Sequence, residues 1–327
     1  MNFSVLDNGK VDGFAIVKSV DVKTSSKGDT YLDFTLGDKS GEINAKLWQY
    51  NKAEHGEFSA NDVIKIRGTI SPYNGADQLR IERIRHSAPG DEISVEDLVK
   101  SAEYSPELMF DTLIKIAENM ADGELKLIVT EIYKDSKEKL LFWPAAYKLH
   151  HAMRGGLLMH TLSIVRLCER VCEIYSFIDK DLLISGAMLH DISKLEEYVA
   201  SESGTASGYS VKGNLLGHLT MGAEKVGKYA EKLGVSDEKT TLIKHMILSH
   251  HGVPEFGAAV RPMFIEAEIL SELDLLDSRI YEMRDALSGV KKDEFSHPVW
   301  ALENRKLFNH QRANLDGSTK LITTEEN

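Results

Sequence analysis

The feature that most constrains the fold is a change in hydrophobic periodicity near residue 90. Before this point, apolar residues alternate at period two, as they do in strands with one buried face. Turn-forming Ser, Gly, Asp and Asn residues separate the alternating segments. The segments are residues 13–20, 30–36, 42–48, 63–70 and 78–84. Five short antiparallel strands of this kind predict a small closed β-barrel.

After residue 90 the apolar residues recur at spacings of three and four, which is typical of helices packed on a core. Helices are expected at residues 107–120, 124–134, 157–175, 181–190, 215–233, 237–250 and 264–281, the first capped by Ser94 or by Ser105 and Pro106. Residues 201–214 are rich in Gly and Ser and predict a flexible insertion. The sequence therefore predicts a barrel domain (1–90), a helical connector (91–140), an all-α domain (141–315) and a flexible tail (316–327).

The charge distribution bears on the class of ligand. A net charge of −12 argues against nucleic acid, which is bound by neutralising phosphates. However, the first ninety residues carry equal numbers of acidic and basic side chains, so the whole net negative charge lies in the helical part. The chain shows no apolar run of roughly 18 residues, no secretory signal and only two cysteines. We therefore expect a cytoplasmic protein without membrane contact.

A set of histidines and aspartates lies on or at the ends of the expected helices, in strongly apolar neighbourhoods. A single buried histidine is most often a core residue with a hydrogen-bond partner, because an ionisable group is costly to bury otherwise. Several such residues in one domain are better explained by a metal centre, and imidazole with carboxylate suits Mn, Fe, Co or Zn. The set comprises His160, His190, Asp191, His218, His250, His251 and Asp274.

The order H…HD…H…HH…D resembles the HD superfamily of metal-dependent phosphohydrolases. The run from His190 to Lys194 (HDISK) is similar to the superfamily signature and departs from it only at Ser193, where Gly is common. Combined with a barrel of the OB-fold type, the chain resembles the YhaM family of bacterial 3′–5′ exoribonucleases over nearly its whole length. The GGLLMHT and LSHHG segments strengthen this resemblance.

The resemblance implies an N-terminal all-β OB-fold barrel followed by an all-α HD domain with two divalent metal ions, manganese being preferred to cobalt, iron or zinc. It implies a first ion held by His160, His190, Asp191 and Asp274, and a second held by Asp191, His218 and His250. Two alternatives stay open. Asp277, one helical turn beyond Asp274, is the rival for the last ligand, and His251 is either a ligand or a phosphate contact.

Other residues near the signature are candidates for phosphate contacts. Lys194 follows Asp191 by three residues, so both can point at one cavity, and we expect the two to be catalytic. The alternative is a solvated surface lysine. His151 and Arg154 could contact phosphate or ribose, although a structural role before Gly155 is equally well supported.

The expected barrel also offers a nucleic-acid surface. Alternation places Leu32, Phe34 and Leu36 inside, and leaves an outward set in which aromatic and basic side chains interleave. Stacking platforms with cations along them are what a sequence-tolerant single-strand binder requires. The structural alternative is that Trp48 packs under a loop. The outward set comprises Tyr31, Lys46, Trp48, Lys65, Arg67, Tyr73 and Arg80.

The leading hypothesis is a metal-dependent 3′–5′ exoribonuclease that degrades single-stranded RNA, with single-stranded DNA as a further candidate, to nucleoside 5′-monophosphates by two-metal hydrolysis. One rival is an HD-type nucleotide or cyclic-dinucleotide phosphohydrolase, which the barrel disfavours because a small substrate needs no guide. Another is a non-catalytic nucleic-acid-binding regulatory or replication factor, which the complete ligand set disfavours. The apolar segment 94–134 leaves room for a homo-oligomer.

Overall fold

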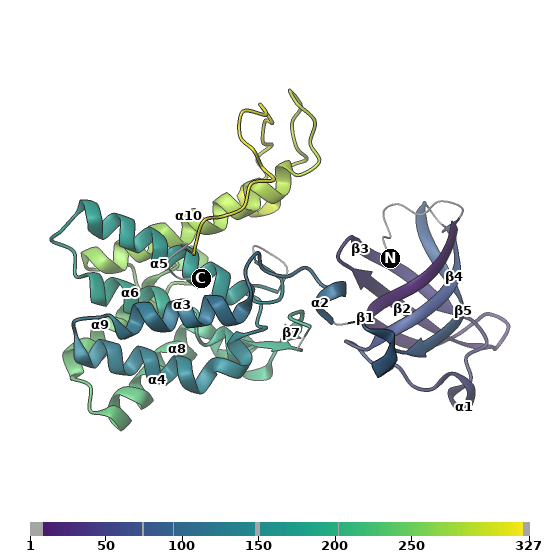
Figure 1. The fold of residues 1–327 in the computed structure, drawn as a ribbon, viewed down its shortest axis with the longest axis horizontal. Coiled ribbons are helices and arrows are strands. Elements are labelled where there is room, and N and C mark those ends of the chain that lie inside the picture. Colours follow the sequence, from purple (N-terminus) through teal and green to yellow (C-terminus); the bar gives the residue numbers. More distant parts are fainter. Residues whose placement is uncertain (1–8, 74, 94, 148–150, 202, 323–327) are drawn as a thin grey trace. The chain divides into compact units, whose positions relative to one another are not determined.

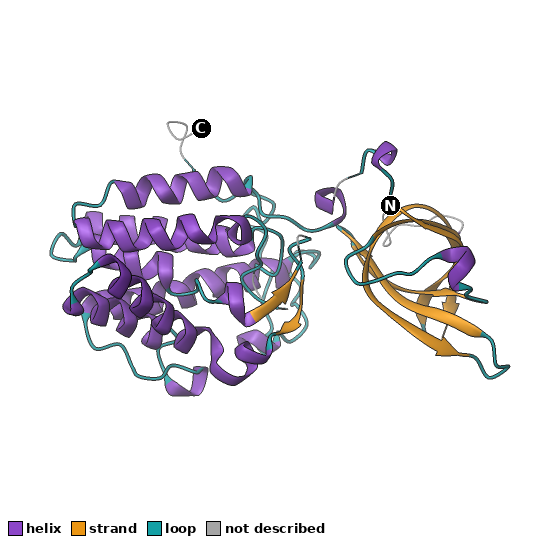
Figure 2. Cartoon of the chain, turned by 90° about the horizontal axis from the view of Figure 1, so that it is seen from below, coloured by secondary structure: helices purple, strands orange, loops and turns teal. Residues whose placement is uncertain are grey.

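The computed structural model describes residues 9–73, 75–93, 95–147, 151–201 and 203–322 (Figures 1 and 2). The chain divides into two compact units, of which the first ends at Ser101 and the second begins at Ala102. The sequence predicted a barrel ending at residue 90 and a separate helical connector after it. In the structure, most of that connector belongs to the helical unit, because its two long helices contribute to the same core.

Five strands form the first unit, and Figure 2 shows them closing into a ring. Their order around the barrel is β1-β2-β3-β5-β4. Neighbours pair antiparallel except β3 and β5, which pair in parallel, so the expectation of wholly antiparallel strands is wrong at this seam. The strands are β1 (Lys10–Thr24), β2 (Thr30–Asp38), β3 (Gly41–Leu47), β4 (Val63–Tyr73) and β5 (Ala76–His86), accompanied by α1 (Lys52–His55), η2 (Pro89–Asp91) and α2 (Val95–Leu98).

The barrel core confirms the period-two prediction. Leu32, Phe34 and Leu36 of β2 are all buried, and the ring of Phe58 packs edge-on against Phe34 with centroids 5.8 Å apart. The register between β4 and β5 shifts after Arg67, because β5 carries an extra residue there, and a Cβ on Gly68 would lie only 2.3 Å from the main-chain oxygen of Arg80. Glycine at this position therefore lets the two strands pair closely.

The second unit is helical, and the expected helices are confirmed. They pack around one hydrophobic core. Ser105 caps the first long helix, where its side chain accepts from the backbone of Leu108, whereas the alternative cap Ser94 lies outside the described residues. None of the described helices combines the length and apolar character needed to cross a membrane. The helices are α3 (Pro106–Glu118), α4 (Gly123–Leu140), α5 (Gly156–Ile174), α6 (Lys180–Leu189), α7 (Lys194–Glu197), α8 (Val211–Leu233), α9 (Asp237–Ser249), α10 (Ile265–Leu287), η3 (Pro254–Phe256) and η4 (Trp300–Leu302).

Two segments contain structural elements or contacts that the sequence did not predict. Within and beside the expected insertion at 201–214, strands β6 (Tyr198–Ala200) and β7 (Ala206–Tyr209) form a hairpin, after which α8 begins. The described part of the expected tail is also held in place. Leu321 is buried, and its carbonyl accepts a hydrogen bond from Nε of Arg166 at 2.7 Å.

Candidate active site

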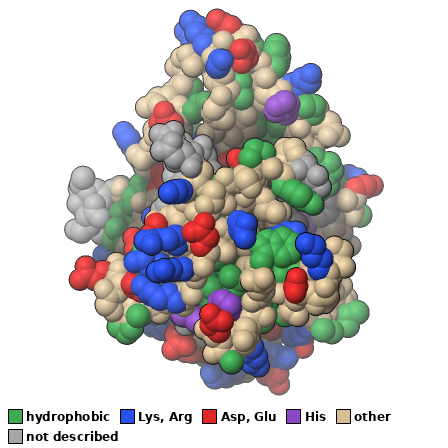
Figure 3. All heavy atoms as spheres, turned by 90° about the vertical axis from the view of Figure 1, so that its right-hand side faces the viewer, with side chains coloured by type: hydrophobic (Ala, Val, Ile, Leu, Met, Phe, Trp, Pro, Cys, Tyr) green, Lys and Arg blue, Asp and Glu red, His purple; other side chains and the backbone are tan. Residues whose placement is uncertain are grey.

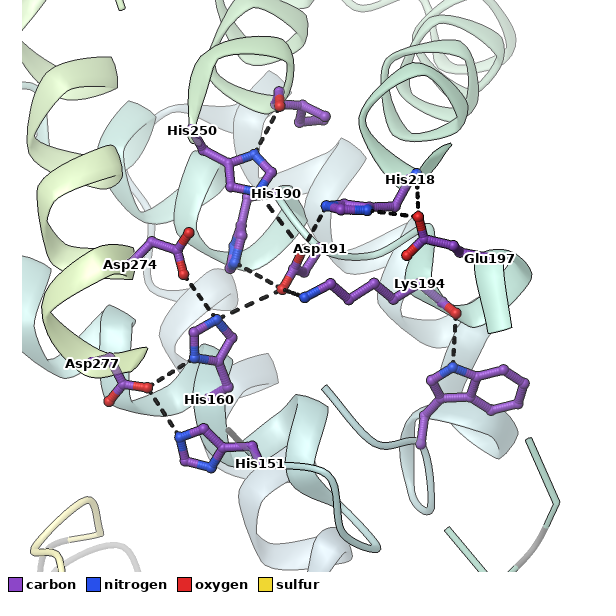
Figure 4. Close-up of polar contacts among 12 residues, drawn as sticks. His151, His160, His190, Asp191, Lys194, Glu197, His218, His250, Asp274 and Asp277 are labelled. Atoms are coloured by element: carbon purple, nitrogen blue, oxygen red, sulfur yellow. Dashed lines mark hydrogen bonds and ion pairs between the residues drawn. The ribbon is translucent and has the colours of Figure 1, made fainter. Parts of the chain in front are cut away.

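Five segments of the helical unit place the expected ligands around one point (Figure 4). α5 carries His160, the end of α6 leads into His190 and Asp191, and α10 carries Asp274. His218 lies on α8, and His250 directly follows α9. His160 and His190 are fully buried and Asp191 is 2% exposed, so the group lies inside the protein. The structure thus brings together residues that lie far apart in the sequence.

Asp191 lies at the centre of the group, and its two carboxylate oxygens face different histidines. Oδ2 is 3.6 Å from Nε2 of His160 and 3.2 Å from Nε2 of His190. Oδ1 is 3.4 Å from Nε2 of His218 and 3.7 Å from Nε2 of His250. The carboxylate therefore divides the four imidazoles into two pairs, as a ligand that bridges two cations would do.

The opposite nitrogen of each imidazole is anchored on a hydrogen-bond acceptor. In a neutral imidazole, which is the form that binds a metal, an acceptor at Nδ1 keeps the proton there and directs the Nε2 lone pair toward Asp191. Lone pairs and carboxylate oxygens repel each other unless positive charge lies between them. The four Nδ1 contacts are His160 to Asp277 Oδ2 (2.8 Å), His190 to the carbonyl of Ala187 (2.8 Å), His218 to Glu197 Oε1 (3.0 Å) and His250 to the carbonyl of Ile247 (2.8 Å).

Several buried atoms that face this point fit a divalent cation. Among the described residues, Nε2 of His190, His218 and His250 and Oδ1 of Asp191 have no hydrogen-bond partner. Two groups of three, His160 with His190 and Asp191, and His218 with His250 and His251, each offer ligand atoms within 4.8 Å of one another. Imidazole nitrogens with carboxylate oxygens suit borderline divalent metals.

The structure separates the two rival aspartates of α10. Oδ1 of Asp274 lies 3.1 Å from Nε2 of His160, the nitrogen that faces Asp191. Asp277 instead contacts Nδ1, on the other edge of the same ring. The geometry therefore favours Asp274 as the ligand. Asp277 then lies behind His160 as its hydrogen-bond partner.

The electrostatics of the site follow from burial opposed by close charges. Burial alone would raise the pKa of Asp191, but Lys194 and His190 hold it well below its usual range. Burial lowers the pKa of His160, but hydrogen bonds to Asp274 and Asp277 outweigh this effect and raise it to about 10. Asp191 is therefore a carboxylate anion at neutral pH, which is the form that binds a cation.

Lys194 points into the site. Its ammonium lies 2.7 Å from Oδ2 of Asp191, and the side chain is buried, so the alternative of a solvated surface lysine is wrong. Burial lowers the pKa of Lys194, but the charge of Asp191 outweighs burial and raises it, which keeps the ammonium protonated. The indole of Trp143 fixes the backbone here by donating to the carbonyl of Lys194 at 2.8 Å.

The remaining candidates in this unit occupy different positions. The ring of His251 lies 4.4 Å from that of His250, on the side of His218. His151 is buried and its Nε2 lies 3.1 Å from Asp277, behind His160. Arg154 donates to the carbonyl of Leu141 at 3.1 Å. In the loop before α5, both His151 and Arg154 therefore form hydrogen bonds with other groups of the protein.

Glu197 is a residue of the site that the sequence reasoning missed. One of its oxygens accepts from both the ring Nδ1 and the backbone nitrogen of His218, each at 3.0 Å. Burial raises the pKa of Glu197, but His218 more than compensates and lowers it. The only sequence signal was its position three residues after Lys194, and that signal did not separate it from the half-buried Glu196.

On the barrel, five of the seven expected nucleic-acid contacts line one groove of about 810 Å³. The rings of Tyr31 and Trp48 lie 4.6 Å apart, and Nζ of Lys46 is 5.2 Å from the first and 5.6 Å from the second. Tyr73 and Arg80 complete this set, which we call the aromatic groove. Residues of the β1–β2 turn, including Lys27, also line the groove and were not anticipated.

The other two expected contacts lie elsewhere on the barrel. Lys65 extends over the ring of Phe14 at 5.1 Å, and the guanidinium of Arg67 forms an ion pair with Asp12. Neither residue lines the aromatic groove. Figure 3 shows one face of the molecule on which Lys and Arg side chains gather, with exposed hydrophobic side chains among them.

Comparison with known proteins gives the same division of the chain. Residues 157–279 match the HD domain, and residues 15–86 match the OB-fold nucleic acid binding domain. The 3′-5′ exoribonuclease YhaM of Listeria welshimeri is 35% identical over 299 residues, which cover 91% of this chain and 95% of the relative. The YhaM of Bacillus pumilus is 34% identical over 299 residues, with 91% and 94% covered. With both domains and nearly the full length shared, the chain belongs to the YhaM family of 3′–5′ exoribonucleases.

Proposed function

We propose that this chain is a metal-dependent 3′–5′ exoribonuclease that hydrolyses single-stranded RNA to nucleoside 5′-monophosphates in the cytoplasm. The observation that carries the proposal is the position of Asp191, whose two oxygens face two separate pairs of imidazole nitrogens. Such an arrangement suits a site for two cations that share one anionic ligand. The kinship with YhaM exoribonucleases supports the same reaction class.

The residues of the site would hold two divalent ions, with manganese as the expected metal. When bound, such ions activate water and neutralise the phosphate oxygens of the substrate. His160, His190, Asp191 and Asp274 would hold the first ion, and Asp191, His218, His250 and His251 the second.

Lys194 provides a positive charge that belongs to the protein itself. Its ammonium is buried beside Asp191, and Trp143 holds its backbone, so the charge is fixed before substrate arrives. A preorganised cation of this kind stabilises the negative charge that develops on a phosphate in the transition state. We therefore assign Lys194 to the scissile phosphate.

The aromatic groove would guide the RNA strand. Tyr31 and Trp48 offer ring faces, and Lys46 and Arg80 offer positive charge along the same surface. Bases of any sequence can stack on aromatic rings while the cations contact the phosphates. The groove therefore suits single-stranded RNA, or DNA, without strong sequence preference.

The direct test is a time course with Mn²⁺ and single-stranded RNA labelled at its 5′ end. We expect progressive shortening from the 3′ end with release of nucleoside 5′-monophosphates. Equal activity on RNA whose 3′ end is blocked would reject the exonuclease mode. Hydrolysis of nucleotides or cyclic dinucleotides without any shortening of RNA would point to the nucleotide phosphohydrolase alternative.

The Asp191→Asn variant tests whether cleavage and RNA binding are carried by different units. We expect it to abolish turnover while leaving RNA affinity nearly unchanged, because the aromatic groove lies in the other unit. Asp111→Asn, at an exposed position on α3, is the control and is expected to behave as wild type. Loss of both cleavage and RNA binding in Asp191→Asn would contradict the division of labour between the two units.

A further inference from the structure

We propose that His151, Asp277 and Tyr281 form a second layer that fixes the ring of His160 for metal binding. In this arrangement Asp277 is a positioning residue and not a metal ligand. The inference rests on the proposed function, because it concerns the first of the two ion positions. Figure 4 shows Asp277 beside two imidazoles, with a contact to the ring of His160 and another to the ring of His151.

Helix α10 holds both edges of the His160 ring. Asp274 reaches Nε2 at 3.1 Å, and Asp277, three residues later on the same helix face, reaches Nδ1 at 2.8 Å. A carboxylate on Nδ1 fixes the ring orientation and makes the opposite nitrogen a stronger electron donor. The two aspartates therefore have complementary roles, one at the ion and one behind its ligand.

His151 in turn orients Asp277. Oδ2 of Asp277 accepts from both imidazoles, at 2.8 Å from Nδ1 of His160 and 3.1 Å from Nε2 of His151. The ring of Tyr281 lies against the ring of His151, with centroids 4.2 Å apart. Tyr281 comes one helical turn after Asp277 on α10, so this helix contacts the rings of both His151 and His160.

The backbone of His151 is held in an unfavourable conformation. Its φ is 53°, in the left-handed region that costs a residue with a side chain on the order of 1–3 kcal/mol. Its carbonyl accepts from the backbone of Ala145 at 3.1 Å and of Met153 at 2.8 Å. A Cβ on Gly156 would lie 2.0 Å from that same carbonyl oxygen, so glycine is required for the close approach. Neighbouring groups thus stabilise a strained loop that places a buried imidazole on Asp277.

The two ion positions differ in how the carboxylate of the second layer is held. Among the four central imidazoles, His160 and His218 have a carboxylate behind them, whereas His190 and His250 have main-chain carbonyls. Glu197 is fixed by two contacts with His218 itself and needs no third residue. Loss of His151 should therefore affect the first ion and leave the second.

The experiment is calorimetric titration of metal-stripped, full-length protein with Mn²⁺, together with metal analysis after dialysis. We expect His151→Ala and Asp277→Ala to weaken the binding of one Mn²⁺ ion by about 10–100-fold, the range seen when the hydrogen-bond partner of a metal-bound histidine is lost. His151→Gln, whose amide can still donate to Asp277, should retain more affinity than His151→Ala. Asp277→Asn keeps the shape of the side chain and provides a second test if an alanine variant fails to fold.

The control is His245→Ala, since His245 lies on α9 outside the site and accepts from the backbone of Met263 at 3.0 Å. It should bind both ions as wild type does. Unchanged affinities in the His151 and Asp277 variants would overturn the proposal. Loss of an ion in Asp277→Ala, with no effect of His151→Ala or His151→Gln, would also overturn it and make Asp277 a ligand. Failure of the proposed function would appear earlier, as a wild-type protein that binds no Mn²⁺, and would remove the basis of this inference.

Discussion

Replacing Trp48 by alanine tests whether the aromatic groove binds RNA. Trp48 is 39% exposed, so part of its surface can receive a base, and its ring packs against Tyr31 at 4.6 Å. The ammonium of Lys46 lies 5.6 Å from the indole and 5.2 Å from the Tyr31 ring. The variant removes one stacking platform and one of the rings that position Lys46.

The size of the effect follows from these contacts. A base stacked on an aromatic side chain contributes about 1–3 kcal/mol. Tyr31 stays in the groove and can still receive a base, so we expect a loss in the lower part of this range, about 1–2 kcal/mol. At about 1.4 kcal/mol for each factor of ten, the Kd for a long RNA should rise roughly 5–30-fold.

Fluorescence anisotropy with a long labelled RNA, in the presence of a chelator that prevents cleavage, measures this change. Trp300→Ala is the matched control, because Trp300 is 76% exposed and belongs to the helical unit. Trp48→Ala should bind RNA more weakly while cleaving a dinucleotide at the wild-type rate. An unchanged Kd, or an equal loss in Trp300→Ala, would show that Trp48 has only a structural role.

Three further predictions concern stability. Removing the metal with a chelator should abolish cleavage and lower the melting temperature, and Mn²⁺ at about 100 times its Kd should restore about 2.7 kcal/mol for each ion bound; an unchanged melting curve would argue against a built metal site. Burial lowers the pKa of His250 well below its usual value. In chelator, circular dichroism melts should therefore show the unfolding free energy decreasing as the pH falls below about 6.5, where the unfolded chain takes up a proton that the native His250 does not. The pKa of His160 is raised, so at a pH well below about 6.5 this residue is protonated in both states and adds no pH dependence to the unfolding free energy. Gly213→Ala should lower the melting temperature by an amount corresponding to about 1–3 kcal/mol, because its Cβ would lie 2.2 Å from the carbonyl oxygen of Glu197. Gly208→Ala, which has open space around it, should not.

The residues that face the metal position could be predicted because each carries its signal in its own sequence neighbourhood. A histidine or aspartate within an apolar helix is unusual by itself, and the resemblance to HD phosphohydrolases supplied the order of the set. The residues behind them carry no such signal. Glu197 follows Glu196 at the end of the four-residue helix α7, which is too short for periodicity to show which of the two side chains is buried.

Asp274 and Asp277 illustrate the same difficulty on a long helix. Both positions share a face of α10, so spacing alone allowed either to be the last ligand. Only the orientation of the His160 ring separates them, since one aspartate meets Nε2 and the other meets Nδ1. That orientation depends on packing between α5 and α10, which is a long-range contact that a local pattern does not contain.

On the barrel, the alternation pattern predicted correctly which side chains face outward, but not which of them share one surface. Period-two alternation tells inside from outside, but the outside of a closed barrel is a full circle, and residues that share it need not share a surface. Lys46 joins Arg80 in the aromatic groove because β3 pairs with β5 at that position. Lys65 also points outward, but β4 pairs with β1 there and places it opposite Phe14. Membership of the groove was therefore decided by strand order, and the parallel seam between β3 and β5 is the part of that order which alternation along a single strand does not determine.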